Sequence, residues 1–147
     1  MLEVPEKNLV QFLLESERRF PRRAAVWSER GSLSYQQLLQ EVRAMAGLLQ
    51  SWGVEPGDRV FLLLPNWPQF VIASQAIWWV GGVAVLSSPL IPAPVLIDQL
   101  RKARPRVVIT SNRLESALAQ SIRNLGVERI LLSSGREYLR TQVGWVF

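Results

Sequence analysis

The sequence predicts an α/β fold, in which parallel βαβ layers are flanked by helices. First, no charged side chain occurs between Arg59 and Asp98, so this stretch must be buried in protein or in lipid. Second, Pro and Gly divide the stretch into two strand-length apolar runs around one helix-length piece. Third, the alternation continues after Pro94, with helices expected at 95–103 and 112–124 and strands expected at 106–110 and 129–132. Parallel strands joined by helices are typical of an α/β domain.

The first forty residues predict a helix followed by a small hairpin. We expect an amphipathic helix from Asn8, its cap, to about Arg19, ended by Pro21. Residues 24–27 are typical of a short strand, and a turn at 29–31 leads to a return strand through Leu33.

The next helix is predicted over residues 34–52. Ser34 and Gln37 fit a capping box, in which each side chain binds a backbone N–H at the start of the helix. A continuous apolar stripe runs along the helix, formed by Tyr35, Leu38, Val42, Met45, Leu49 and Trp52. Gly53 suits the left-handed residue after a helix, and a turn at 56–58 leads into the next strand.

The uncharged stretch is expected to form one βαβ unit. Residues 60–64 predict a strand covered on both faces, and residues 83–86 predict a second buried strand. Asn66 is expected to cap the helix between them, which begins near Pro68. Gly81-Gly82 ends that helix where the backbone must approach another element closely.

Composition limits the chemistry that this chain can perform. With 147 residues and 48% hydrophobic content, residues 1–147 suit a single domain or subdomain, with an irregular tail at 135–147. Cys and His are absent, which removes thiolate chemistry and the commonest general base. The first twenty residues do not have the pattern of a signal peptide, so we expect a cytoplasmic protein. No apolar piece is long enough to be a transmembrane segment.

The net charge is +5, arginine supplies nearly all of the positive side chains, and two groups of basic residues form clusters. These are Arg18, Arg19, Arg22 and Arg23, and Arg101, Lys102, Arg104 and Arg106. We interpret both as solvated helix ends, the first within reach of Glu15 and Glu17, and we expect no nucleic-acid partner. A membrane-associated protein that uses Trp78 and Trp79 is a further hypothesis. A buried core explains these two residues better, because neighbouring residues on a helix point in different directions.

Five motifs occur in one order and give the chain a family resemblance. They are Phe20-Pro21, Leu33-Ser34-Tyr35 with Leu38, Gly53-Val54 leading to Pro56-Gly57-Asp58-Arg59-Val60, Leu64-Pro65-Asn66 with Phe70, and Gly81-Gly82-Val83-Ala84-Val85 leading to Pro89. Together they resemble the amino-terminal part of the adenylate-forming, or AMP-binding, superfamily, and most of all the acyl-CoA synthetases (long-chain fatty-acid–CoA ligases). The resemblance covers the chain up to about Leu132. It implies that the fold is the first part of the large amino-terminal domain of such an enzyme.

The resemblance also implies a reaction for the parent enzyme. A carboxylate attacks the α-phosphate of ATP to give an acyl-adenylate, and coenzyme A then displaces AMP, with Mg²⁺ assisting. The family's phosphate loop and catalytic lysine have no counterpart here. Residues 133–135 and 110–112 come closest to the loop, but the first lacks a second Gly and a Lys, and the second is interpreted as a helix cap. We therefore expect no catalytic, cofactor-binding or metal-binding residue in this chain. ATP, Mg²⁺ and CoA are implied for the parent enzyme alone.

Two hypotheses for function follow. The first is an amino-terminal fragment of an acyl-CoA synthetase, inactive alone. The second is a binding or assembly module that forms a homo-oligomer or complements a separate chain carrying the rest of the enzyme.

Overall fold

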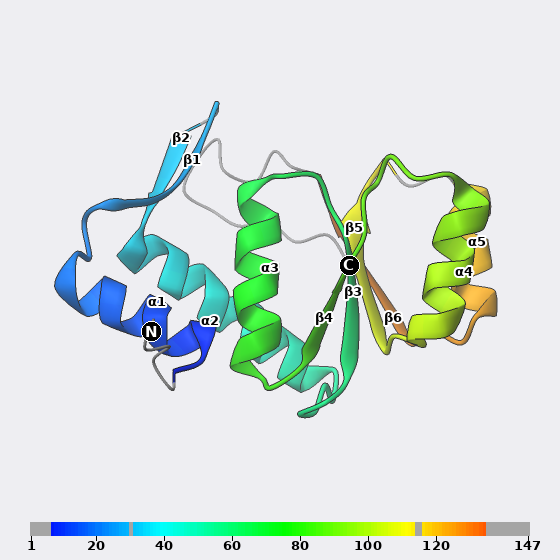
Figure 1. The fold of residues 1–147 in the computed structure, drawn as a ribbon, viewed down its shortest axis with the longest axis horizontal. Helices are drawn as coiled ribbons and strands as arrows, with labels where there is room; N and C mark the ends of the chain where they lie inside the picture. Colours follow the sequence, from blue (N-terminus) through cyan, green and yellow to red (C-terminus); the bar gives the residue numbers. More distant parts are fainter. Residues whose placement is uncertain (1–6, 30, 114–115, 135–147) are drawn as a thin grey trace, which may run out of the picture.

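The computed structural model describes residues 7–29, 31–113 and 116–134. A four-stranded parallel sheet occupies one part of the molecule, with helices on both of its faces (Figure 1). A helix and a two-stranded hairpin lie at the end of the molecule farthest from α4 and α5 (Figure 1). The α/β fold predicted from the sequence is confirmed. The tail at 135–147 lies outside the described residues.

The amino-terminal elements follow their local sequence. Helix α1 spans Leu9–Arg19, and its capping box joins Asn8 and Gln11 through two hydrogen bonds of 2.9 Å. The antiparallel strands β1 (Ala24–Ser28) and β2 (Gly31–Ser34) form the expected hairpin.

Helix α2 spans Tyr35–Ser51 and begins with the predicted capping box of Ser34 and Gln37. Its apolar stripe is buried against α3 and the hairpin. The helix thus forms the outer layer on one side of the sheet.

The remaining elements alternate along the chain. They are β3 (Arg59–Leu63), α3 (Pro68–Trp79), β4 (Val83–Leu86), α4 (Ala93–Ala103), β5 (Val107–Ser111), α5 (Ser116–Asn124) and β6 (Arg129–Ser133). Their strand order is β4-β3-β5-β6, and each neighbouring pair is parallel.

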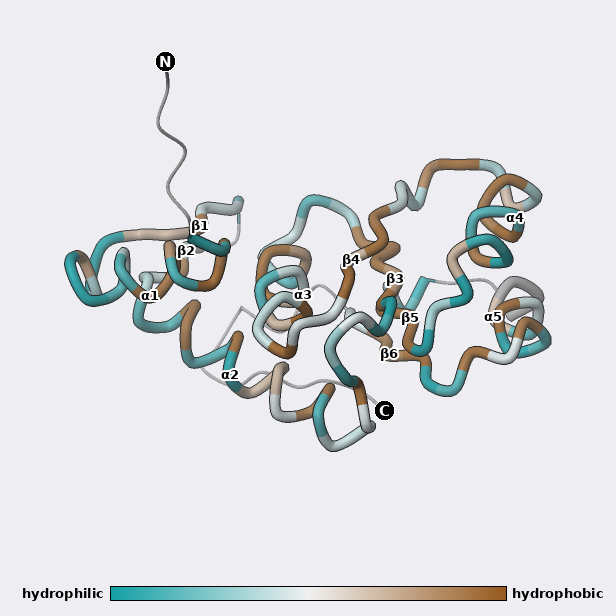
Figure 2. The backbone as a smooth tube through the Cα atoms, turned by 60° about the horizontal axis from the view of Figure 1, so that its bottom comes forward, coloured by the Kyte–Doolittle hydropathy of each residue, from teal (hydrophilic) through white to brown (hydrophobic). Residues whose placement is uncertain are grey.

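The chain winds across the sheet in both directions from β3. Alternate residues of β3 enter two separate cores, as the period of a strand requires. Val60 and Leu62 pack with α2 and α3, whereas Phe61 and Leu63 pack with α4 and α5. Hydrophobic residues concentrate in the strands between these helices (Figure 2). The sheet is therefore covered by α3 on one face and by α4 and α5 on the other.

Two predictions about the central unit were wrong. Asn66 does not cap α3: the helix begins at Pro68, its N-cap is Trp67, and no side chain binds the free N–H groups there. Because the helix starts one residue later than a cap at Asn66 requires, Asn66 is left exposed. Strand β4 is not buried, because it is an edge of the sheet, and Val83 and Leu86 are exposed.

The chain from 110 to 112 is not a helix cap either. Thr110 and Ser111 belong to β5, and Asn112 and Arg113 follow them in a turn, so the hydroxyls lie at the end of a strand. The prediction for Gly81-Gly82 was correct: Gly81 has a φ of +76°, and Gly82 is buried against the backbone of Asp58.

The two basic clusters differ in their surroundings. Arg101 and Lys102 end α4 and pair with Asp98, as a solvated helix end predicts. Glu15 instead pairs with Lys7, and none of the ion pairs among the described residues includes the first cluster. Within the described ranges, no helix combines the length and apolarity needed to cross a bilayer.

Candidate functional site

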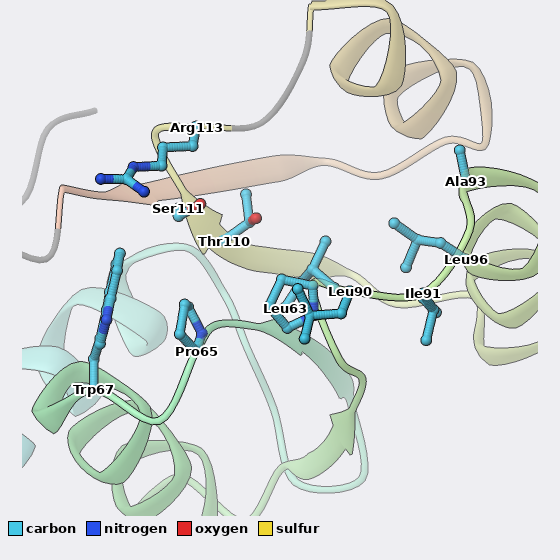
Figure 3. Close-up of a pocket in the computed structure, with 11 residues that line it drawn as sticks. Leu63, Pro65, Trp67, Leu90, Ile91, Ala93, Leu96, Thr110, Ser111 and Arg113 are labelled. Atoms are coloured by element: carbon cyan, nitrogen blue, oxygen red, sulfur yellow. The ribbon is translucent and has the colours of Figure 1, made fainter.

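A pocket of about 440 Å³ lies at the carboxyl edge of the sheet, between β3 and β5 (Figure 3). These neighbouring strands lead to helices on opposite faces. Such a reversal leaves a crevice between the two connections, and open α/β sheets bind ligands at this position. The residues that line the pocket are Leu63, Pro65, Trp67, Pro89, Leu90, Ile91, Ala93, Leu96, Thr110, Ser111 and Arg113.

Three separate segments of the chain supply these walls. Leu63 and Thr110 are register partners at the ends of β3 and β5, so the sheet itself fixes the floor. The connection between β4 and α4 crosses this edge and brings Leu90 and Ile91 over it (Figure 3). Paired strands therefore form one wall of the pocket, and a loop forms the other wall.

The pocket has an apolar side and a polar side. Figure 3 shows Leu63, Leu90, Ile91 and Leu96 gathered together, with Arg113 and Ser111 at the other end. Arg113 is the lining residue that carries a charge, and it is exposed, whereas the Thr110 side chain is buried. Leu90 is 92% exposed although it borders the pocket, so this wall leaves a large apolar side chain in water.

A charged cluster lies at the opposite, amino edge of the sheet. Arg106 donates to Asp58 at 3.0 Å and to Glu128 at 3.2 Å, and these residues precede β5, β3 and β6 respectively. The backbone N–H of Glu55, together with the Arg106 guanidinium, holds the pKa of Asp58 below its usual value. This cluster ties three strands together and faces away from the pocket.

Glu41 is a second carboxyl group with a shifted pKa. It lies on α2, and partial burial raises its pKa because the charged form loses solvation. It is not among the residues that line the pocket.

Residues 110–112 and Ser133, the described parts of the two segments that come closest to a phosphate loop, lie side by side. The backbone N–H of Asn112 donates to the carbonyl of Ser133 at 2.8 Å, which continues the pairing of β5 with β6. The side chain of Ser133 is buried. Ser111 and Ser133 therefore pair within the sheet, and Thr110 and Ser111 also border the pocket.

Sequence reasoning did not find this pocket. The pattern at Thr110 and Ser111 favours a helix cap, and Pro89 and Pro92 indicate only a break between elements. The order of the strands brings them together, and a single sequence does not specify that order. A usable indication was the polar pair directly after the apolar run at 107–109.

The lining residues do not fit a magnesium site. Mg²⁺ is held by carboxylates and phosphate oxygens, and the lining residues that belong to the described part of the chain include neither Asp nor Glu. One arginine and two hydroxyl groups can contact an anion, but they do not form the glycine-rich backbone cradle that grips a polyphosphate.

Comparison with known proteins places the chain in a family. A family model described as AMP-binding enzyme matches residues 13–142. The long-chain-fatty-acid–CoA ligase of Bacillus subtilis (strain 168) is 34% identical over 139 residues, which cover 94% of this chain and 25% of that enzyme. The 3-hydroxypropionyl-coenzyme A synthetase of Sulfurisphaera tokodaii is 35% identical over 109 residues, covering 71% of this chain and 16% of that protein.

Solved structures show the same fold. The anthranilate CoA ligase AuaEII in complex with anthranoyl-AMP superposes with a TM-score of 0.82 at 24% identity, over 95% of this chain and 28% of that one. The chain spans about a quarter or less of the curated relatives it matches. Because the family model matches nearly the whole length of this chain, the chain belongs to the AMP-binding enzyme family.

Proposed function

We propose that this chain is the amino-terminal part of an acyl-CoA ligase and has no ligase activity alone. The observation that supports this proposal is the unequal coverage: 94% of this chain aligns with only 25% of a long-chain-fatty-acid–CoA ligase. In the complete enzyme, ATP would activate a carboxylic acid as its acyl-adenylate, and CoA would then displace AMP.

In that enzyme this chain would form one wall of the active site and hold it in place. The pocket between β3 and β5 is open to solvent on one side, and Leu90 is exposed at its rim. The remaining part of the enzyme would cover that wall and supply the residues that contact ATP and the acyl group. Burial of Leu90 would also remove an apolar side chain from water.

A direct assay tests activity. The purified chain is incubated with ATP, Mg²⁺, CoA and a series of fatty acids, and AMP is measured, with the intact Bacillus subtilis ligase as the positive control. We expect no AMP above the level without enzyme. Reproducible AMP formation that depends on the fatty acid would show that the chain is a catalyst by itself.

A chimaera tests the family role separately. This chain replaces the aligned segment of the Bacillus subtilis ligase, and solubility and circular dichroism confirm that the product is folded. We expect acyl-CoA formation to be retained at a reduced rate. A folded chimaera without any turnover would contradict the proposal that this chain supplies the equivalent part.

A second candidate function is assembly with another copy or with a complementary chain. The observation that favours it is the apolar rim formed by Leu86, 54% exposed, and Leu90, 92% exposed. A second hollow of about 530 Å³ lies beside this rim, bordered by Asn66 and Phe70 among others. Such a patch is typical of an interface.

Light scattering tests this candidate. We expect a mass above that of the 16.7 kDa monomer for the wild type and a monomer for a variant with Leu86→Ser and Leu90→Ser. Val95→Ser is a suitable control, because this residue is also exposed but does not border either hollow. A monomeric wild type at high concentration would argue against self-assembly.

A further inference from the structure

The first basic cluster lies in the last turn of α1 and just after it, and the same helix carries exposed apolar side chains. We call this surface the α1 flank and define it by Leu9, Phe12, Arg18, Arg19, Phe20, Arg22 and Arg23. It lies at the end of the molecule opposite to α4 and α5 in both views (Figures 1 and 2). It is therefore separate from the pocket at the carboxyl edge.

Helix geometry places part of this surface on one side of α1. At 3.6 residues per turn, the directions of Leu9, Phe12 and Arg19 fall within about 80° of arc. The buried Leu13 marks the side that faces the core, and its direction lies about 40° from that of Leu9 and about 100° from that of Phe12. Leu9 is 51% exposed and Phe12 is 41% exposed, so the stripe borders the buried side and carries apolar surface that the described part of the fold does not cover.

The end of the helix joins these apolar residues to the cations. Phe20 is 40% exposed, and the guanidinium carbons of Arg19 and Arg23 lie 5.6 Å and 4.9 Å from the centre of its ring. Both cations stack on one aromatic ring and stay at the surface. The Phe20 ring and the two guanidinium groups thus form a group of mixed apolar and cationic character at the end of the helix.

The charge of the α1 flank is not compensated by the fold. Arg18, Arg19, Arg22 and Arg23 are exposed, and none takes part in the ion pairs of the described residues. Of the two acidic residues of α1, Glu15 pairs with Lys7 at 2.6 Å, and Glu17, which directly precedes Arg18, forms none of the ion pairs of the described residues. The flank therefore presents a concentrated positive charge beside exposed aromatic and aliphatic side chains.

We propose that the α1 flank docks on the surface of a phospholipid bilayer that carries net negative charge. Arginines would contact lipid phosphates, and Phe12, Leu9 and Phe20 would enter the boundary between headgroups and acyl chains. This combination of basic and apolar residues is the one that holds peripheral helices on anionic membranes. A polyanion such as nucleic acid would use the arginines but leave the apolar stripe in water, which is why we favour the bilayer. The proposal does not depend on ligase activity.

Vesicle sedimentation tests the proposal with the whole chain. Vesicles of phosphatidylcholine mixed with phosphatidylglycerol are compared with vesicles of phosphatidylcholine alone. We expect binding to the anionic vesicles, weakened by added salt, and little binding to the neutral ones. Equal binding to both, or to neither, would overturn the proposal.

Two matched charge variants locate the surface. One carries Arg→Gln at positions 18, 19, 22 and 23, and the control carries Gln at Arg101, Lys102, Arg123 and Arg129, at the other end of the molecule, for the same change in net charge. Each arginine at an anionic surface contributes about fivefold to affinity, so we expect the first variant to lose about a hundredfold or more. The control should keep binding close to that of the wild type. Equal losses would mean that net charge alone attracts the chain, and the proposal would be wrong.

A neutral substitution separates a bilayer from a soluble polyanion. Phe12→Ala removes apolar surface from the flank without changing charge, and Val95→Ala on α4 is its control. We expect Phe12→Ala to weaken vesicle binding several-fold and the control to leave it unchanged. Circular dichroism confirms that both variants are folded. Tight binding to duplex DNA combined with no effect of Phe12→Ala on vesicle binding would overturn the proposal in favour of a nucleic-acid surface.

Discussion

Replacing Gly82 by Ala tests how closely β4 is held against the start of β3. A Cβ atom at Gly82 would lie 3.1 Å from Cγ2 of Ile77 and 3.2 Å from the carbonyl oxygens of Ile77 and Asp58. Two of these three neighbours are backbone atoms, which cannot move without shifting α3 or β3. The φ of Gly82 lies outside the left-handed region, so the cost is steric. Overpacking of this kind costs about 1–3 kcal/mol.

Gly47→Ala provides a matched control with the opposite sign. Gly47 lies inside α2, and an added Cβ would meet nothing within 4 Å. Alanine has the higher helix propensity, so we expect this variant to gain about 0.5–1 kcal/mol.

Urea unfolding followed by circular dichroism measures both variants. We expect the midpoint to fall for Gly82→Ala and to rise for Gly47→Ala, with similar slopes, and thermal midpoints to move by about 2–4 °C per kcal/mol. If Gly82→Ala is as stable as the wild type, the close approach of α3, β3 and β4 does not constrain the fold as we have argued.

Three other predictions concern single interactions. A double-mutant cycle of Arg106→Ala and Asp58→Ala should give a small favourable coupling, since the two groups are in contact at 3.0 Å but are exposed to solvent. The pKa of Asp58 is lowered in the folded state, so this stabilisation is present above the unfolded pKa and is lost as the pH falls through the folded pKa. A coupling free energy that does not change with pH would contradict the contact between the Arg106 guanidinium and the Asp58 carboxylate. Glu41→Gln should raise the thermal midpoint at neutral pH, because burial raises the pKa of Glu41 and the charged form is disfavoured; the gain should vanish below the unfolded pKa, about 4.3. Ser34→Ala should cost about 1 kcal/mol in urea unfolding, and no loss would mean that the capping box contributes nothing.

The features that the sequence predicted well depend on neighbouring residues. The caps at Asn8 and Ser34 form because a side chain reaches a backbone N–H three residues away. The close approach at Gly81-Gly82 was visible for a similar reason, since the pair follows a helix and precedes a strand. Local spacing was enough for each of these.

The errors came from contacts between distant segments. The apolar sequence of β4 is typical of a central strand, yet β4 is an edge, because β5 takes the other side of β3. The pocket was missed for the same cause: its walls come from residues 63–67, 89–96 and 110–113, which only the strand order brings together. Asn66 is the exception, because a shift of a single residue in the helix start decided its role.

The position of β3 in the sheet also has a consequence for biosynthesis. This strand is flanked by β4 and by β5, and β5 begins only at Val107. During translation β3 can pair with β4 first, and the other edge of β3 stays unpaired until β5 has left the ribosome. Phe61 and Leu63, whose core includes α4 and α5, stay uncovered during the same interval. A pause in translation before β5 would thus expose a nascent chain with an open, apolar strand edge, the state in which a chaperone is most needed.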